Sequence, residues 1–255
     1  MTKRLEGKVA IVTGAAGYLG TSHCLHLARE GARVVVTDIV DGQKTVDAVK
    51  KTGGEAIFIQ VDVSKWEDTQ RMAEETLKVY GRIDILINNA ALTANIQKPW
   101  TEFTPEEWDR NLAVDLKGMF LCARAVFPAM ERQQFGRIVN ITSGTISLGS
   151  PNLLPYVSAK AGVVGFTRSL ATEVGAHNIT VNAILAGLYP HEVAGDRGFE
   201  NMDAISSFIV AMQALKRVGK PEDLSPSVVF LSSDESGWIT GQVIAVDGGL
   251  VRSGG

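Results

Sequence analysis

The sequence contains little of what marks secreted, membrane-spanning or nucleic-acid-binding proteins. Only two cysteines, Cys24 and Cys122, occur among its 255 residues, which favours reduced thiols in a cytoplasmic protein over a disulfide framework. No apolar run reaches the length that crosses a membrane, so no membrane partner is expected. The net charge is only −3, which argues against nucleic acid as a partner and leaves a small-molecule substrate as the prediction.

Histidine is also scarce, with four residues in the chain. His23 and His26 lie three apart on a predicted helix, a spacing that would suit a metal ion, but Cys24 lies between them and no acidic partner is near. We therefore interpret the two histidines as part of a surface helix face and predict no metal site.

The sequence does have a regular alternation of short β-branched runs and longer helical patterns. Most of the runs are apolar throughout, as expected when helices cover both faces of a parallel sheet. The predicted strands are Lys8–Thr13, Arg33–Asp38, Glu55–Gln60, Ile83–Asn88, Arg137–Thr142, Ile179–Ile184 and Gln242–Val246. The predicted helices are Leu19–Glu30, Lys65–Tyr80, Pro105–Arg132, Pro155–Val174 and Pro221–Leu231. This alternation predicts an α/β protein: a single-domain doubly wound Rossmann fold over residues 1–255, with a seven-stranded parallel sheet and helices on both faces.

One stretch after the sixth predicted strand interrupts this alternation. Leu188–Arg217 is too long for an ordinary loop, so it is either a functional lid or a disordered segment. Apolar residues recur at helical spacing within Met202–Leu215, which favours a substrate lid at about residues 188–217.

The first predicted strand ends in a glycine-rich turn, Thr13–Gly20, that leads into a helix. Glycines at such a turn let the backbone approach a pyrophosphate, which the helix N-terminus attracts, although a tight turn packed on the sheet is the alternative. Asp38 ends the second strand about twenty residues later, where an acid accepts the hydrogen bonds of an adenosine ribose and repels a 2′-phosphate. Because the turn holds no basic residue and Ile39 follows the acid, these features predict NAD rather than NADP.

The predicted cofactor-binding residues continue along the same edge of the sheet. Asp62, at the end of the third strand, is a candidate for holding the adenine, although a simple turn residue is nearly as good an explanation. The full predicted set is Gly14, Gly17, Tyr18, Leu19, Asp38, Asp62, Val63, Asn89, Ala90, Tyr156, Lys160 and Gly187.

Tyr156 and Lys160 are four residues apart on one predicted helix, which places them on the same face, one turn apart. A free tyrosine titrates at about pH 10, and a neighbouring ammonium stabilises its phenolate. Ser143 follows the fifth strand, where its hydroxyl can hold a substrate oxygen beside Tyr156. A surface Tyr–Lys pair and a turn serine are the ordinary alternatives, but the meeting of all three at the carboxyl edge of a parallel sheet favours catalysis.

Taken together, these motifs are similar to those of the short-chain dehydrogenase/reductase family over essentially the whole chain. They are Thr13–Gly20, Asn88-Asn89-Ala90, Ser143, Tyr156-x-x-x-Lys160 and the ending Asp247-Gly248-Gly249. The resemblance implies that Tyr156 is the general acid and base, that Lys160 binds the nicotinamide ribose and lowers the pKa of Tyr156, and that Ser143 orients the substrate oxygen. It also implies direct hydride transfer to or from nicotinamide, and a homotetramer built partly on the helices Pro105–Arg132 and Pro155–Val174.

Two departures from the family concern the chemistry. Asp115 stands where the family has a helix asparagine whose backbone carbonyl holds a relay water. Aspartate keeps that carbonyl, so we count Asp115 among the catalytic residues with Ser143, Tyr156 and Lys160, and we note that a second acid can shift Lys160. His191, preceded by Pro190, falls near the position of the threonine that meets the nicotinamide carboxamide.

Three further departures concern the backbone. Gly14, Gly17 and Gly20 are evenly spaced, as in longer members that epimerise or dehydrate nucleotide sugars, and Ala91 and Ala186 replace a glycine and a proline.

The sequence predicts an NAD(H)-dependent dehydrogenase or reductase acting on the carbinol or carbonyl carbon of a small, cyclic or secondary alcohol or ketone. From Tyr156 to Val251 the chain is similar to members that oxidise secondary alcohols or the hydroxymethyl group of ring compounds. Two alternatives stay open: a nucleotide-sugar epimerase or dehydratase, and a non-catalytic NAD-responsive binding protein. The predicted substrate contacts are Ser143, Thr145, Leu148, Leu154, Tyr189 and His191.

Overall fold

A computed structural model describes residues 3–92, 97–190 and 202–251 of the chain. Seven strands form one parallel sheet in the order β3-β2-β1-β4-β5-β6-β7. The strands are β1 (Val9–Thr13), β2 (Arg33–Asp38), β3 (Ala56–Gln60), β4 (Ile85–Asn88), β5 (Gly136–Ser143), β6 (Ile179–Ala186) and β7 (Val243–Val246). The predicted fold is therefore confirmed: this is a doubly wound α/β sheet whose strand order reverses between β1 and β4.

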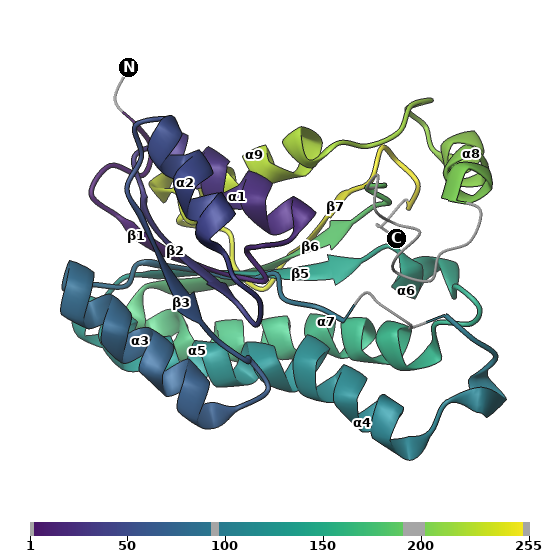
Figure 1. The fold of residues 1–255 in the computed structure, drawn as a ribbon, viewed down its shortest axis with the longest axis horizontal. Helices are drawn as coiled ribbons and strands as arrows, with labels where there is room; N and C mark the ends of the chain where they lie inside the picture. Colours follow the sequence, from purple (N-terminus) through teal and green to yellow (C-terminus); the bar gives the residue numbers. More distant parts are fainter. Residues whose placement is uncertain (1–2, 93–96, 191–201, 252–255) are drawn as a thin grey trace.

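Helices cover both faces of the sheet (Figure 1). One face carries α1 (Tyr18–Arg29), α2 (Gln43–Lys51) and α9 (Pro221–Ser232). The opposite face carries α3 (Trp66–Tyr80), α4 (Pro105–Leu112), α5 (Gly118–Gln133) and α7 (Leu154–Val174). Two short helices, α6 (Thr145–Leu148) and α8 (Met202–Met212), lie beyond the carboxyl ends of β5 and β6.

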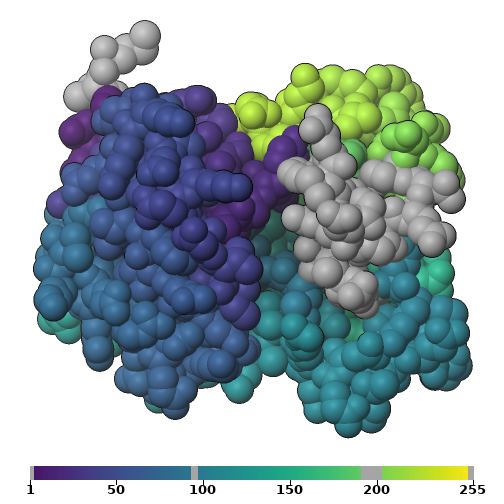
Figure 2. All heavy atoms as spheres, viewed as in Figure 1, coloured from purple at the N-terminus to yellow at the C-terminus, as the bar shows by residue number. Residues whose placement is uncertain are grey.

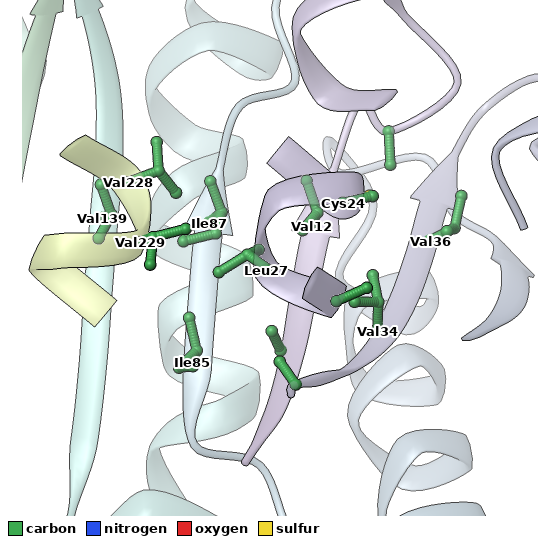
Figure 3. Packing of buried hydrophobic residues seen from close by; sticks show 14 of the residues in the cluster. Val12, Cys24, Leu27, Val34, Val36, Ile85, Ile87, Val139, Val228 and Val229 are labelled. Atoms are coloured by element: carbon green, nitrogen blue, oxygen red, sulfur yellow. The ribbon is translucent and has the colours of Figure 1, made fainter. Parts of the chain in front are cut away.

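Apolar side chains fill the space between the sheet and both helical layers. Figure 3 shows one cluster, in which Cys24 and Leu27 of α1 and Val228 of α9 meet side chains of β1, β2, β4 and β5. A second cluster lies under α3 and α5 and includes Met72 and Cys122. The strands β1, β2, β4, β5 and β6 bury side chains on both faces, which explains why most strands read as apolar runs. Both cysteines are free and buried.

Three details differ from the sequence expectation. The helix α2 was not predicted, because only Val46 and Val49 among its nine residues give it an apolar stripe. The predicted helix Pro105–Arg132 is interrupted by a π-helical turn, Ala113–Lys117, which separates α4 from α5. His23 was predicted on a surface helix face and is instead fully buried, with Nδ1 2.9 Å from Ser225 Oγ of α9.

Within the described residues, no helix is long and apolar enough to cross a membrane. In the same ranges, no three histidine, cysteine, aspartate or glutamate side chains gather so as to hold a metal ion.

Candidate active site

A cavity of about 1140 Å³ opens at the carboxyl edge of the sheet, where the strand order reverses between β1 and β4. Its walls come from the turn after β1, the ends of the neighbouring strands, and the helices α7 and α8. In Figure 2, purple and blue residues on one side and teal and green residues on the other border a hollow. All twelve predicted cofactor-binding residues line this one cavity.

The glycine turn brings backbone amides to the cavity wall. Gly14 has φ +63°, and a Cβ there would lie 2.7 Å from the Ala90 Cα, so only glycine fits at this approach of β1 to β4. Gly17 precedes α1 without a side-chain cap, and no acidic residue lies in the first turn of that helix. The first amides of α1 and the positive end of its dipole therefore suit an anionic group such as a pyrophosphate.

Asp38 faces this turn from the end of β2. Its Oδ2 accepts a hydrogen bond from the Ala16 amide at 2.9 Å, and its Oδ1 accepts one from the Val40 amide at 3.2 Å. Each carboxylate oxygen keeps lone pairs for a further donor, which is what a ribose diol requires.

The side chains of two predicted cofactor-binding residues form hydrogen bonds within the protein. The Asn89 side chain donates to the carbonyls of Thr13 and Gly14 at 2.9 and 3.1 Å, so it ties β4 to the glycine turn. The Asp62 Oδ1 accepts hydrogen bonds from the Ser64 amide and hydroxyl. Asn89 therefore holds the glycine turn in place, and Asp62 stabilises the turn after β3 while it also lines the cavity.

Gly187, at the end of β6, lies against the segment after β7. A Cβ on Gly187 would lie 2.8 Å from the Asp247 Cα, so the glycine lets the two segments approach at the cavity rim.

Tyr156, Lys160 and Ser143 line the same cavity as the glycine turn. Tyr156 and Lys160 lie one turn apart on α7, and the Lys160 Nζ is 5.6 Å from the centre of the Tyr156 ring. Burial raises the pKa of Tyr156; the Lys160 ammonium and a hydrogen bond with Ser143 oppose this effect, and the Asp115 carboxylate adds to it.

Ser143 ends β5, and its side chain is held by the next helix. Its Oγ accepts hydrogen bonds from the Thr145 amide at 3.3 Å and the Thr145 hydroxyl at 3.0 Å. Because Thr145 occupies these acceptor positions, the Ser143 hydroxyl proton is left to be donated towards Tyr156 and the cavity. Thr145 lines the cavity as well, so this predicted substrate contact also positions Ser143.

Lys160 is buried, and two oxygens hold its ammonium. Nζ donates to the Ile141 carbonyl at 3.1 Å and lies 3.2 Å from the Asp115 Oδ1. Asp115 is fully buried in the π-helical turn and does not line the cavity. Of the four predicted catalytic residues it is the one outside the cavity lining, and its ion pair is with Lys160.

The predicted substrate contacts separate into three groups. Leu148 and Tyr189 line the cavity, as Ser143 and Thr145 do, although the Tyr189 hydroxyl donates to the Val246 carbonyl at 2.6 Å. Leu154 is 45% exposed and lies outside the lining; the preceding Leu153, which is buried, lines the cavity instead. His191 falls outside the described residues.

The sequence prediction missed part of an apolar wall that α8 supplies. Ile205, Phe208, Ile209 and Met212 all line the cavity. Their i, i+3, i+4, i+7 spacing is the signal of one helix face, and this helix lies within the lid predicted at about residues 188–217. Arg110 of α4 also lines the cavity and was not predicted.

The described residues fit a nicotinamide dinucleotide. An uncapped helix start, a carboxylate at the end of β2 and a buried lysine beside a tyrosine border one continuous space. The glycine turn would hold the pyrophosphate, Asp38 the adenosine ribose, and Lys160 the nicotinamide ribose.

Comparisons with known proteins place the chain among oxidoreductases. The family model described as Enoyl-(Acyl carrier protein) reductase matches residues 14–251. The (2S)-[(R)-hydroxy(phenyl)methyl]succinyl-CoA dehydrogenase subunit BbsD of Thauera aromatica is 39% identical, over 96% of this chain and 97% of its own. The 3-oxoacyl-acyl-carrier-protein reductase FabG of Thermotoga maritima is 36% identical, over 97% and 99%.

A solved structure from Sinorhizobium meliloti 1021, described as a candidate short-chain alcohol dehydrogenase, superposes with a TM-score of 0.91 and 36% identity, over 98% of both chains. The matching relatives are dehydrogenases and reductases, which favours oxidoreduction of a CH–OH or C=O group over epimerisation or ligand binding alone. The chain belongs to the short-chain dehydrogenase/reductase family, whose members use a nicotinamide cofactor.

Proposed function

We propose that the protein is an NAD(H)-dependent dehydrogenase or reductase acting on a small secondary alcohol, cyclic or aryl-substituted, or on the corresponding ketone. The observation that carries the proposal is that Ser143, Tyr156 and Lys160 line the same cavity as the glycine turn and Asp38. The free, buried cysteines agree with a cytoplasmic location, which is part of the proposal.

In the proposed mechanism, the chain moves one proton and holds one oxygen. The bound nicotinamide supplies the hydride donor or acceptor. Ser143 donates a hydrogen bond to the substrate oxygen and keeps its proton, and Tyr156 removes or returns the one proton of that oxygen. Lys160 stabilises the phenolate form of Tyr156, because an ammonium near a phenol favours its charged state.

The choice of NAD rests on charge at the end of β2. Asp38 would accept the ribose hydroxyls and would repel a 2′-phosphate at the same place. No arginine or lysine occurs in the glycine turn or directly after Asp38, so nothing in the neighbouring sequence offsets the carboxylate. NADPH is the competing cofactor, since relatives of similar identity are reductases.

The preference for a ring-bearing substrate rests on the apolar wall. Ile205, Phe208, Ile209 and Met212 face the cavity from α8, and Leu148 and Leu153 face it from the other side. An apolar ring gains free energy when such surfaces leave water. The Thauera aromatica relative is named for a substrate with a hydroxyl-bearing carbon attached to a phenyl group, which supports this choice.

A second candidate is a hydroxyacyl or oxoacyl group carried as a thioester. The printed names of two relatives, one a CoA thioester dehydrogenase and the other an acyl-carrier-protein reductase, favour it. Steady-state kinetics with cyclic and aryl alcohols beside hydroxyacyl thioesters would separate the two. Turnover confined to the thioesters would reject the small-alcohol proposal.

The catalytic assignment is tested by Tyr156→Phe, which removes only the hydroxyl. We expect kcat to fall by about 10² or more, while NADH binding measured by fluorescence stays near that of the parent. Tyr80→Phe is the matched control, because Tyr80 is buried at the end of α3, away from the cavity lining. Full turnover by Tyr156→Phe would assign the proton transfer to another group.

A further inference from the structure

Asp115 and Lys160 form a buried ion pair. The two side chains are 0% and 2% exposed, and Nζ lies 3.2 Å from Oδ1. Asp115 Oδ2 accepts the Leu92 amide at 3.1 Å, so the carboxylate is fixed from the loop after β4. Oδ1 accepts no hydrogen bond of good geometry from the described residues, and the Lys160 ammonium is the charge beside it.

The π-helical turn is what places Asp115 there. The turn Ala113–Lys117 adds a residue's worth of rotation between α4 and α5, where α7 packs alongside. Leu116, the next residue, packs so closely on α7 that a Cβ on Gly162 would lie 2.7 Å from its side chain. The backbone therefore brings the carboxylate to Lys160 by close packing of two helices.

We propose that Asp115 is the fixed counter-ion of Lys160 and that, by neutralising this ammonium, it keeps the Tyr156 hydroxyl protonated to higher pH. Asp115 is then a positioning residue that favours the proton-donating form of Tyr156, the form that carbonyl reduction uses. This inference rests on the proposed role of Tyr156 as acid and base.

The physical reason is the difference between a single charge and a pair. An ammonium alone attracts a phenolate as a monopole, whereas an ammonium 3.2 Å from a carboxylate acts as a dipole whose field falls off faster. Burial raises the pKa of the Asp115 carboxyl, while the Lys160 ammonium and the Leu92 amide both stabilise its charged form. A neutral Asp115 would leave the Lys160 ammonium uncompensated, so the effect depends on the charge of this one carboxyl.

The other polar groups near Tyr156 do not replace this effect. Ser143 on β5 is neutral and stabilises the phenolate. Arg110 on α4 and Tyr189 after β6 line the same cavity, Arg110 at an exposed position and Tyr189 with its hydroxyl bonded to the Val246 carbonyl. Neither has Asp115's direct contact with Lys160.

The test is a direct titration of the tyrosines. The chain has only four, so ¹³Cζ-tyrosine labelling gives four NMR signals, and Tyr156→Phe identifies the one of interest. We expect Asp115→Asn to move the Tyr156 midpoint to lower pH. Asparagine is the family residue at this position and keeps an oxygen for the Leu92 amide, so the variant should fold. A midpoint that stays in place or rises would overturn the proposal.

Asp223→Asn is the matched control. Asp223 is a carboxylate paired with Arg217 and lies near Tyr189 rather than Tyr156. The Asp223→Asn variant should leave the titration midpoint of the Tyr156 signal unchanged. If Asp115→Asn yields too little folded protein, Asp115→Ser tests the same loss of charge.

Kinetics provide the second measurement. In alcohol oxidation below the Tyr156 midpoint, kcat/KM should rise in Asp115→Asn about tenfold for each pH unit that the midpoint moves down. The NMR midpoint is measured without substrate, so a shift in that midpoint would support the charge pairing even if Tyr156→Phe retained activity. In that case the proposed function would fail while the inference about the ion pair stood.

Discussion

At the carboxyl end of β2, the Asp38 carboxylate is held by the amides of Ala16 and Val40, with its outer face towards the cavity. This arrangement predicts that Asp38→Ala narrows the preference for NAD over NADP, because it removes the repulsion of a 2′-phosphate and the acceptor for the ribose. The measurement is kcat/KM with both cofactors.

Asp38→Asn separates the two contributions to that preference. The amide keeps an oxygen for the Ala16 amide but loses the charge, so repulsion of NADP should fall while the glycine turn stays in place. A parent enzyme that already prefers NADP would contradict the assignment of Asp38.

At the scale of the elements, the contact between α1 and α9 contains a buried histidine. Burial lowers the pKa of His23 to about 3, and its Nδ1 lies 2.9 Å from Ser225 Oγ. The unfolded chain protonates this residue below about pH 6.5, whereas the folded protein keeps it neutral until about pH 3. The contribution of His23 to the free energy of unfolding is therefore complete above pH 6.5, and it is lost as the pH falls from 6.5 to about 3.

We expect the free energy of unfolding to decrease by up to about 1.4 kcal/mol per pH unit from His23 alone in that range. His23→Gln should flatten this part of the profile in urea unfolding measured from pH 7 to pH 4. Ser225→Ala keeps the histidine and should keep the slope. An unchanged slope in His23→Gln would contradict the burial argument.

The helix α8 makes a separate prediction about substrate binding. Phe208 lines the cavity and is otherwise 64% exposed, so a bound ring would cover surface that water now contacts. Phe208→Ala should raise KM for an aryl alcohol by about tenfold, the equivalent of about 1.4 kcal/mol, and leave kcat nearly unchanged. Ser207→Ala, at an exposed position next to it on the helix, is the control. A fall in kcat alone would point instead to a role in closing the site.

How much of this the sequence predicts depends on how local each interaction is. The strands and the pairing of Tyr156 with Lys160 both follow from short-range periodicity. The predicted strand ends therefore lie within about two residues of the observed ones. The Asp115–Lys160 contact joins residues 45 positions apart through a π-helical turn that an uninterrupted apolar stripe conceals. Leu153 and Leu154 show the same limit, because a shift of one residue at a helix start changes which side chain faces the cavity.

At the scale of the whole molecule, both halves of the chain contribute to one cavity. The glycine turn, Asp38 and Asp62 come from the first half, and Ser143, Tyr156 and Lys160 come from the second. The parallel sheet makes this possible, because it brings the carboxyl end of every strand to the same edge. Binding a dinucleotide would therefore link the two halves, and it should raise the unfolding temperature in proportion to the logarithm of its concentration.

The outer surfaces of the helical layer predict how whole molecules associate. Phe120 on α5 and Leu154 on α7 are 46% and 45% exposed, on two helices of the layer that covers one face of the sheet (Figure 1). Apolar side chains that are exposed on such helices are stabilised when a second copy covers them, and the family resemblance implies a homotetramer built partly on these helices.

Light scattering should give a mass about four times the 27.3 kDa of the chain. Phe120→Asp should yield a smaller species, because it would place a charge in the contact, while Val79→Asp on the exposed face of α3 should not. A parent protein that stays monomeric at micromolar concentration would show that these side chains are merely exposed, and that α5 and α7 serve the active site alone.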